Sequence, residues 1–589
     1  MRENVPAITQ QLLRSRIGKI CVAITGSTPA EMLEKAALAV KENPFIEFRL
    51  DYLENPLAAL SKIKHFFEEN TAATGIATCR RKANGGKFAG SIPAELEILI
   101  KAATSGFHLV DLELESAESL KKADIQKLRD TGIAIIISHH DFNATKDLDG
   151  IYKRMAVYQP DFYKIVPTAK SLSDNVTLMR FIERMEDHSK IVGICMGDMG
   201  IISRVLGLRA GSAFTFAAAT AGEETGPGQI AARTLIETYR IDQVDAATKV
   251  YGVVGNPIRS SLSPVMMNTA FRRETVNAVY LALQATKVSD LIKLVHEIPI
   301  QGLSVTMPFK QEIMEHLERT DPLSAKIGAC NTVLRAQDGN LYGFNTDVAG
   351  IIGPLEKRMS LRDAKVLVLG AGGAGRAAVF GLRDKGADVF IYNRTPETAH
   401  KLARQSGSHS IKKDAIAKTN FDVIINSTPV GMAGQKHAPI LEAKDLNTRL
   451  VFDLVYNPLD TPLIRMARQM NIPIITGVEM FVQQGARQFE IWTGKPAPEE
   501  EMLRVVIHSL RQAAEAAAQE QHEAPPAKAA TKSTPAKPAP KAPPAKPAAK
   551  APAAKPAPKP AAKTPAKTVA KPAAKPAAKK SAAKPKKKS

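Results

Sequence analysis

Short apolar runs recur about every 25–30 residues as far as residue 220, and stretches with the spacing of amphipathic helices separate them. The runs cover 19–25, 45–53, 75–80, 108–115, 134–141, 162–167, 191–197 and 213–218. Eight such strand–helix units predict a (β/α)8 barrel. A doubly wound sheet gives a similar alternation, but these units lack a Gly-rich phosphate turn, which favours the barrel.

A junction near Ala247-Thr248 separates this region from a second α/β region. A strand-like run at 250–254 opens it, and a buried run at 364–369 leads straight into the turn Gly370-Ala-Gly-Gly-Ala-Gly375 and a helix. That order of strand, Gly-rich turn and helix is typical of dinucleotide-binding domains. The amphipathic stretch 499–518 predicts a further packed helix.

We therefore predict an α/β protein with four parts, because the chain is too long for a single core. Residues 1–245 would form the barrel, 249–350 a substrate-binding lobe, 351–518 a Rossmann-like domain whose last helix returns to that lobe, and 522–589 a disordered tail. The tail contains almost only Ala, Pro and Lys, which leaves little to bury and breaks helices.

Charge is distributed unevenly along the chain. The net charge is +21, but residues 525–589 hold 18 Lys and no acidic residue, so the remainder carries only about +3. The tail is either a solvated tether or a nonspecific ligand of nucleic acid or another polyanion. No aromatic residue interleaves its lysines, so such binding would be to phosphates. In composition alone the tail resembles that of linker-histone-like proteins.

The four cysteines are far apart and form no CxxC or Cys/His cluster; they are Cys21, Cys79, Cys195 and Cys330. Disulfides and zinc are therefore not expected. The N-terminus lacks the apolar stretch of a signal peptide, and no run is long enough to span a bilayer. We expect a cytoplasmic protein without a metal or a membrane partner.

Polar residues gather at the ends of the predicted barrel strands, where barrel active sites are built. Lys164 lies in an apolar strand; a lone lysine there is more often one whose head group reaches water, but burial also favours the free amine that forms an imine with a ketone. The segment Ser138-His-His-Asp-Phe142 puts a histidine at the end of the preceding strand, where it can shuttle protons. Arg49, Arg80 and Arg204 on other strands suit a carboxylate substrate held bidentately.

This set resembles type I 3-dehydroquinate dehydratase over nearly the whole first half of the chain. The resemblance implies that Lys164 forms a Schiff base with the ketone of 3-dehydroquinate, and that His140, just before Asp141-Phe142, moves protons while water is lost. Its neighbour His139 should point to the other face of the strand. Arg204 would hold the carboxylate. The remaining contacts to hydroxyls, or residues that orient the site, would be Glu47, Arg49, Arg80, Thr225 and Gln229.

The Gly-rich turn alone is a weak sign of a dinucleotide, but the next strand, 388–392, ends in Asn393-Arg-Thr395. An acid at that place would bind the ribose 2′-hydroxyl of NAD and repel a 2′-phosphate, whereas Arg394 offers a planar cation. We therefore predict NADP, with its pyrophosphate over the backbone N–H groups of the helix start. The expected contacts are Gly370, Gly372, Gly373, Gly375, Asn393, Arg394 and Thr395.

The segment before this turn carries hydroxyls, an amine and a carboxylate, each of which alone is common in loops. Ser261 and Ser263 would face the same side of an extended segment. Together with 426–432 and 480–494, these residues resemble shikimate dehydrogenase over about 249–515. The resemblance implies that Lys310 and Asp347 are the proton-transfer pair. It implies that the ring and its carboxylate are bound by Ser261, Ser263, Thr306, Asn331, Tyr456 and Gln484.

Four positions depart from these families. Asn84 precedes Gly85-Gly86 where the dehydratases often have Glu, so it is given no role in positioning His140. Ser260, Met267 and Ser304 stand where the dehydrogenases often have two histidines and an asparagine. These changes concern the fit of the substrate more than the reaction.

We predict a bifunctional enzyme of the shikimate pathway. The first domain would dehydrate 3-dehydroquinate to 3-dehydroshikimate, and the second would reduce that ketone to shikimate with NADPH. Two alternatives remain: a second domain that acts on quinate or shikimate with NAD, and a nucleic-acid-associated protein whose enzyme domains are vestigial. Charged residues such as Lys164 and Asp347 in apolar surroundings argue against the vestigial alternative.

Overall fold

The computed structural model describes Leu13, residues 15–434 and residues 438–523. The predicted disordered tail, 522–589, lies outside the described residues except for its first two, which end a long helix.

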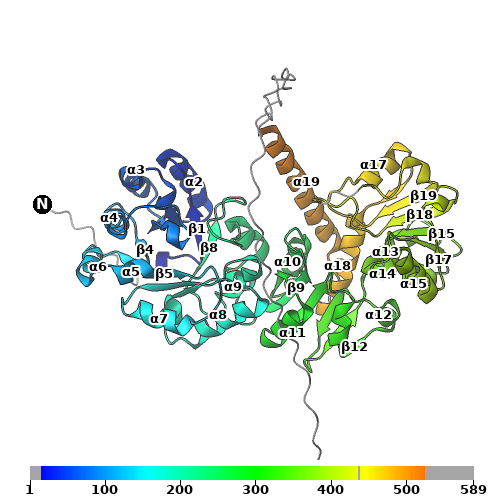
Figure 1. The fold of residues 1–589 in the computed structure, drawn as a ribbon, viewed down its shortest axis with the longest axis horizontal. Helices are drawn as coiled ribbons and strands as arrows, with labels where there is room; N and C mark the ends of the chain where they lie inside the picture. The colour runs from blue at the N-terminus through cyan, green and yellow to red at the C-terminus, as the bar shows by residue number, and fades with distance from the viewer. Residues whose placement is uncertain (1–12, 14, 435–437, 524–589) are drawn as a thin grey trace, which may run out of the picture. The chain divides into compact units, whose positions relative to one another are not determined.

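The first part of the chain is an eight-stranded parallel barrel with helices around it (Figure 1). Its strands are β1 (Ile20–Ile24), β2 (Phe45–Arg49), β3 (Thr74–Thr78), β4 (Leu109–Glu113), β5 (Ala134–His140), β6 (Phe162–Val166), β7 (Ile191–Gly193) and β8 (Thr215–Ala218). They pair in the order β7-β6-β5-β4-β3-β2-β1-β8, so β7 and β8 end the hydrogen-bonded series. The helices are α2 (Pro29–Glu42), α3 (Pro56–Glu69), α4 (Ile92–Ala103), α5 (Leu114–Ser119), α6 (Lys122–Arg129), α7 (Leu148–Ala156), α8 (Leu172–Arg184) and α9 (Ile201–Leu206). The predicted (β/α)8 barrel is confirmed.

The barrel strands are apolar along most of their length and polar where they end. In β5, residues 135–137 are three buried isoleucines, and the polar residues 138–140 follow at the carboxyl end. Several of the following helices begin at a side-chain cap: Thr28, Asn55 and Ser91 each accept a backbone N–H of the first turn. Apolar strands and capped helices thus fix the frame, and the polar strand ends gather on one face of it.

The second part opens with a six-stranded mixed sheet in the order β10-β9-β11-β13-β14-β12. Its strands are β9 (Lys249–Gly255), β10 (Ala278–Gln284), β11 (Ile300–Val305), β12 (Arg319–Thr320), β13 (Thr332–Arg335) and β14 (Leu341–Phe344). Its helices are α10 (Ser263–Arg273), α11 (Val288–Glu297), α12 (Pro322–Ile327) and α13 (Asp347–Glu356). We call this region the substrate lobe.

A parallel six-stranded sheet in the order β17-β16-β15-β18-β19-β20 follows. Its strands are β15 (Lys365–Leu369), β16 (Asp388–Tyr392), β17 (His409–Ser410), β18 (Phe421–Asn426), β19 (Thr448–Asp453) and β20 (Ile474–Ile475). Its helices are α14 (Gly373–Asp384), α15 (Pro396–Ser406), α16 (Lys413–Ile416) and α17 (Pro462–Gln469). The Gly-rich turn lies between β15 and α14, as a Rossmann-like domain requires.

Two final helices, α18 (Gly477–Thr493) and α19 (Glu499–Glu523), complete the core of the substrate lobe. The Trp492 ring lies 5.4 Å from that of Tyr251 on β9, and its Nε1 donates to the carbonyl of Val333 at 3.0 Å. Phe489 packs against Phe271 of α10 with ring centres 5.6 Å apart. The end of the described chain therefore packs on the sheet that opens the second part.

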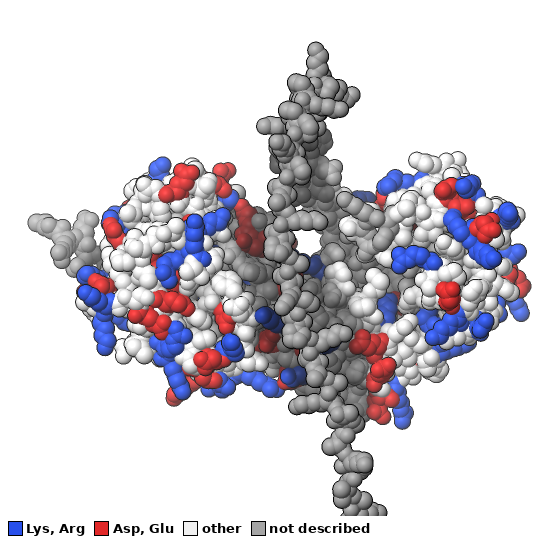
Figure 2. Space-filling view, viewed as in Figure 1, with Lys and Arg blue, Asp and Glu red and all other residues white. Residues whose placement is uncertain are grey.

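Surface charge on the described residues is mixed in sign. Figure 2 shows basic and acidic side chains interspersed over the visible face, in keeping with the near balance of charge outside the tail. Within the described residues, every helix is too short or too polar to cross a membrane.

Candidate active sites

A cavity of about 100 Å³ lies at the carboxyl ends of the barrel strands. Every residue that the sequence assigned to the first site lines it: Glu47, Arg49, Arg80, His140, Lys164, Arg204, Thr225 and Gln229. These side chains come from β2, the ends of β3 and β5, β6, α9 and the segment after β8. The fold thus brings together residues that are far apart in the sequence.

Lys164 is buried, with only 5% of its surface exposed. Its Nζ donates to Asp111 Oδ2 at 2.8 Å, lies 3.5 Å from Glu47 Oε1 and sits 3.7 Å from the centre of the Phe216 ring. Inward-facing carboxylates of β2 and β4 therefore lie beside the amine, together with the apolar neighbours of the strand. The lysine is held in one place by an ion pair and an aromatic face rather than by apolar packing alone.

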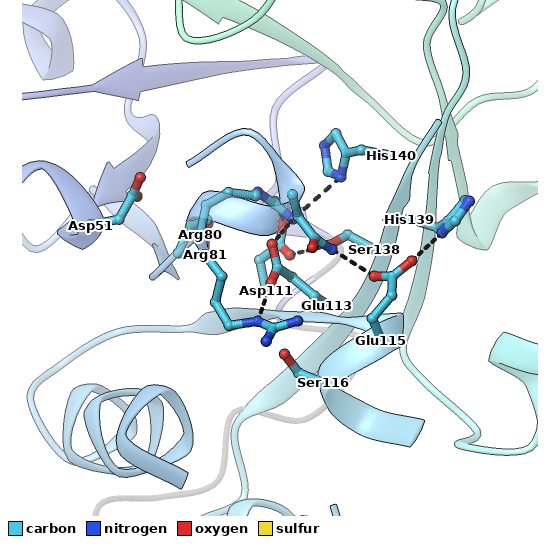
Figure 3. A network of polar contacts seen from close by, with 12 residues as sticks. Asp51, Arg80, Arg81, Asp111, Glu113, Glu115, Ser116, Ser138, His139 and His140 are labelled. Atoms are coloured by element: carbon cyan, nitrogen blue, oxygen red, sulfur yellow. Dashed lines mark hydrogen bonds and ion pairs between the residues drawn. The ribbon is translucent and has the colours of Figure 1, made fainter. Parts of the chain in front are cut away.

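Asp111 on β4 is the centre of the buried charge network (Figure 3). Its carboxylate accepts from Lys164, from Ser138 Oγ at 2.5 Å and from Arg80 Nη2 at 2.9 Å. Burial opposes its ionisation, but Arg80 and Lys164 hold the pKa of Asp111 well below its usual value. Asp111 is therefore a fixed anion that aligns the lysine and one arginine.

His140 lies at the end of β5, where its Nδ1 is 3.3 Å from Arg80 Nη1 and its ring stacks near Phe142. Burial, together with the charges of Arg80 and Lys164, holds the pKa of His140 well below its usual value. The imidazole is therefore neutral at pH 7 and able to take up a proton. His139 instead contacts Glu115, so the two rings have different partners, as strand alternation predicts (Figure 3).

Arg204 differs from Arg49 and Arg80, the other arginines of the cavity, because no carboxylate of the described residues pairs with it. Its Nη2 donates to the carbonyl of Pro227 at 3.1 Å, and its Nε has no hydrogen-bond partner among the described residues. The side chain is only 4% exposed, and burial lowers its pKa to about 10. A buried guanidinium with a free donor is suited to bind an anionic group of a ligand.

The other lining residues are already oriented by their neighbours. Thr225 donates through its backbone N–H and its hydroxyl to Gln229 Oε1, at 2.6 and 3.1 Å. Arg49 is held bidentately by Asp51, with both contacts at 2.9 Å. Glu47 accepts from the Thr78 hydroxyl at 2.6 Å. The polar wall of the cavity is thus preorganised.

The acidic residues behind these lining side chains were not predicted from the sequence. Residues 111–115, which span the end of β4 and the start of α5, alternate Asp111, Glu113 and Glu115 with leucines, which is the same kind of signal that pointed to Glu47 and Arg49. Glu113 accepts from Arg81 at 3.1 Å, and Asn84, a position without an assigned role, donates to Glu115 and not to His140.

The second candidate site centres on Lys310 and Asp347, which form an ion pair. The other Asp347 oxygen, Oδ1, accepts from Asn331 Nδ2 at 2.7 Å, and that amide also lies 3.3 Å from Gln484 Oε1. Asp347 begins α13 and is 2% exposed. The predicted amine, carboxylate and two amides therefore form one connected group at the start of this helix.

The segment 261–264 is not extended, so the condition under which the Ser261 and Ser263 hydroxyls would face the same side is not met. Ser263 and Pro264 begin α10, and the Ser263 backbone N–H lies 3.3 Å from Ser261 Oγ. Proline is favoured in the first turn of a helix, which explains the turn here. Tyr456 lies near this turn: burial raises its pKa, while the backbone of Leu262 and the Ser261 hydroxyl act in the opposite direction.

Ser304, one of the departures, belongs to an internal polar network. It donates to Gln488 Oε1 at 2.7 Å, and Gln488 Nε2 donates in turn to Thr332 Oγ1 at 3.0 Å. Met267 is fully buried in the core of the substrate lobe. The Thr306 side chain packs against Gly255: a Cβ added to Gly255 would lie 2.5 Å from Thr306 Cγ2.

The Gly-rich turn lies beside the Lys310 side chain of the second site. An added Cβ on Gly373 would lie 2.9 Å from Lys310 Cδ, so the turn touches the lysine side chain. A Cβ on Gly372 would meet nothing within 4 Å, which leaves that face of the turn open, and one on Gly375 would lie 2.5 Å from the Gly370 carbonyl. The turn and the helix N-terminus behind it therefore fit a dinucleotide pyrophosphate.

The end of β16 has no acidic side chain. Asn393 donates through Nδ2 to the carbonyl of Thr395 at 3.0 Å, which tightens the turn, and Arg394 between them is exposed. A cation at this place is available to a 2′-phosphate.

Family models match most of the described chain. Type I 3-dehydroquinase matches residues 20–246, the shikimate dehydrogenase substrate binding domain 253–333, shikimate/quinate 5-dehydrogenase 355–459 and the shikimate 5′-dehydrogenase C-terminal domain 477–507. A bifunctional 3-dehydroquinate dehydratase/shikimate dehydrogenase of Arabidopsis thaliana, described as chloroplastic, is 33% identical over 484 residues, which are 77% of this chain and 78% of the relative. The chain belongs to this bifunctional family.

Other relatives match one half of the bifunctional enzyme. An NADP(+)-dependent shikimate dehydrogenase of Maridesulfovibrio salexigens is 38% identical over 268 residues, 44% of this chain and 97% of that protein. A crystal structure of shikimate 5-dehydrogenase from Thermus thermophilus with NADP(H) and shikimate is 34% identical, covers 45% of this chain and 100% of its own, and has a TM-score of 0.42. The enzyme thus joins a 3-dehydroquinate dehydratase and a shikimate dehydrogenase of the shikimate pathway in one polypeptide.

Proposed function

We propose that Lys164 forms the imine with 3-dehydroquinate and that His140 moves the protons of the dehydration. The observation that carries this proposal is the buried amine at the cavity, 2.8 Å from Asp111 and in the same cavity as His140 and Arg204. Arg204 would bind the substrate carboxylate, because its guanidinium has a free donor that faces no protein carboxylate.

In the proposed reaction, the Lys164 amine attacks the ketone carbon and water leaves to form the imine. The cationic imine acidifies the neighbouring carbon, and neutral His140 accepts a proton from it. The same proton returns to the departing β-hydroxyl, so a carbon–carbon double bond forms and a second water is released. Hydrolysis of the imine then frees the amine, and the protein is unchanged overall.

Borohydride trapping tests the imine. With 3-dehydroquinate present, borohydride should reduce the imine, inactivate the dehydratase and add the mass of the reduced substrate adduct to the peptide that holds Lys164. A Lys164→Ala variant should neither trap nor dehydrate, while its reduction of 3-dehydroshikimate continues. Trapping at another lysine, or dehydration by that variant, would refute the assignment.

For the second site we propose that Lys310 and Asp347 transfer the proton to the carbonyl oxygen of 3-dehydroshikimate. Their ion pair and the Asn331 amide that fixes Asp347 support this role. Ser261, Ser263, Thr306, Tyr456 and Gln484 would join Asn331 in binding the polyhydroxy ring. We assign the NADP site to the turn 370–375 and to 393–395; when bound, NADPH supplies the hydride.

The NAD-dependent alternative makes a different prediction for the same chain. An enzyme that acts on quinate with NAD would oxidise quinate faster than shikimate and would prefer NAD to NADP. Arg394 weighs against it, because no acid occupies the end of β16 to hold a ribose 2′-hydroxyl. Initial rates with the four combinations of substrate and cofactor separate the two proposals.

We further propose that the tail binds polyanions, in the cytoplasm, by counterion release. The support for polyanion binding is that residues 525–589 contain 18 lysines and no acidic residue. The support for the cytoplasm is that all four cysteines are unpaired in the structure. DNA retention should fall steeply with salt and be lost when 525–589 are deleted, while both enzyme activities remain. Equal retention by the deleted chain at low salt would refute the proposal.

A further inference from the structure

The loop between β3 and α4 forms one wall of the dehydratase cavity. Asn84 and Gly85 line the cavity, and an added Cβ on Gly85, which has a φ of +80°, would lie 2.4 Å from the Phe142 ring that stacks near His140. Residues 81–88 fold back on themselves, because the Lys82 N–H donates to the carbonyl of Phe88 at 2.9 Å. We call residues 81–88 the wall loop.

Carboxylates from different parts of the barrel hold the wall loop at its start, middle and end; besides the contacts described next, Arg81 Nε lies 3.5 Å from Glu95 Oε2. At its start, Arg81 Nε donates to Glu113 Oε2 at 3.1 Å; near its end, the Lys87 backbone N–H donates to Asp51 Oδ2 at 3.0 Å. In its middle, Asn84 Nδ2 donates to Glu115 Oε2 at 2.7 Å. The middle contact is the one beside the cavity, since Asn84 is itself a lining residue.

Glu115 links this middle contact to the strand that carries His140. Its other oxygen, Oε1, lies 2.6 Å from His139 Nδ1, so the ring nitrogen donates to the carboxylate (Figure 3). Burial opposes ionisation of Glu115, but the hydrogen bonds from His139 and Asn84 lower its pKa. At neutral pH the residue is therefore an anion that accepts from both sides at once.

We propose that Glu115 is a positioning residue of the dehydratase: it fastens the wall loop to the end of β5 and so fixes the cavity around the bound substrate. This role rests on the proposed reaction in the barrel. Glu115 does not touch the cavity, and the side chains proposed for the chemistry have their own anchors, Asp111 for Lys164 and Arg80 for His140. Loosening the wall loop should therefore raise KM for 3-dehydroquinate more than it lowers kcat.

The test compares four variants by their kcat and KM for 3-dehydroquinate. Glu115→Ala and Asn84→Ala should each raise KM about tenfold while kcat falls less than about threefold, because one or two hydrogen bonds to a charged group are lost. Glu115→Gln should stay within about threefold of the parent KM, because its amide oxygen can accept from Asn84 while its NH2 donates to His139. Glu118→Ala is the matched control: it lies on the same helix but pairs with Arg154 at 2.8 Å, away from the loop, and should leave KM unchanged.

The rate of trypsin cleavage measures how often the wall loop opens, and this measurement does not depend on catalysis. Lys82 and Lys87 are exposed within the loop, so cleavage after them should be several-fold faster in Glu115→Ala than in the parent or in Glu118→Ala. Reduction of 3-dehydroshikimate by the same chain verifies that each variant is folded. If KM and loop cleavage of Glu115→Ala both match the parent, Glu115 does not position the loop. If the parent enzyme forms no imine, the proposed reaction is wrong, but the cleavage comparison still tests whether Glu115 holds the loop.

Discussion

Arg204 is a residue at which removal should cost activity but increase stability. Its folded-state pKa of about 10 lies below the value of 12.5 for a free arginine. Below pH 10 the folded and unfolded chains are both protonated at this residue, and the depressed pKa then means that folding is opposed by roughly 3 kcal/mol, at about 1.4 kcal/mol for each pKa unit. As pH rises from 10 to 12.5 this cost disappears, because the folded guanidinium gives up its proton first.

Replacing Arg204 by Met removes the buried charge and keeps most of the apolar stem. The variant loses the hydrogen bond to the Pro227 carbonyl and some packing, so we expect a net gain of about 1–2 kcal/mol at pH 7. For a domain of this size that gain raises the barrel Tm by roughly 2–8 °C. The same variant lacks the guanidinium that would bind the substrate carboxylate, so KM for 3-dehydroquinate should rise by about two to three orders of magnitude.

Calorimetry and initial rates on one preparation measure both effects, and reduction of 3-dehydroshikimate by the same chain is the control for folding. An Arg204→Lys variant should recover little of the KM, because a lysine cannot form a bidentate contact. A Met variant that is less stable than the parent and binds 3-dehydroquinate normally would refute the reasoning, since Arg204 would then be a structural residue.

Three further predictions concern other parts of the chain. Arg394→Ala should lower kcat/KM for NADPH by about tenfold or more and leave NADH unaffected; an equal loss with both cofactors would contradict a contact to the 2′-phosphate. Gly373→Ala would place a methyl group 2.9 Å from Lys310 Cδ, and the resulting displacement should slow 3-dehydroshikimate reduction about tenfold or more with dehydration unchanged, as measured by separate assays of the two reactions. Burial raises the pKa of Glu95 to about 8, so its folded carboxyl keeps a proton that the unfolded chain loses above pH 4.5, and stability should fall as pH rises from 4.5 to 8. Glu95→Gln should therefore gain Tm relative to the parent between pH 5 and pH 8.5, and an equal Tm difference at both pH values would contradict this.

The barrel and the Rossmann-like sheet were predictable because their strands are apolar runs with regular spacing. The lining residues Glu47, Arg49 and Lys164 were found for the same reason: a charge inside an apolar strand is conspicuous. Asp111 follows the same pattern, yet it was missed, since the pattern alone does not say which strand lies opposite the lysine. The pairing appears only in the structure, where β5 separates β4 from β6 and the Lys164 side chain reaches across to Asp111.

Contacts made by loops were less predictable from sequence. The turn at Ser261 and Ser263 depends on the start of α10 at Ser263, with Pro264 in its first turn, and this start competes with an extended conformation of the same segment. The contact of Asn84 with Glu115 joins a loop residue to a residue of α5, and their closeness follows from the barrel, not from their spacing in the sequence. Local pattern gives the elements and the conspicuous charges; the partners of those charges come from tertiary structure.

If the product of the barrel site is the substrate of the second site, the parent enzyme should oxidise NADPH when 3-dehydroquinate is the only organic substrate supplied. We expect one shikimate to form for each NADPH consumed. Lys164→Ala should abolish this flux but still oxidise NADPH when given 3-dehydroshikimate. Absence of NADPH oxidation by the parent chain, or undiminished flux from 3-dehydroquinate in Lys164→Ala, would contradict this expectation.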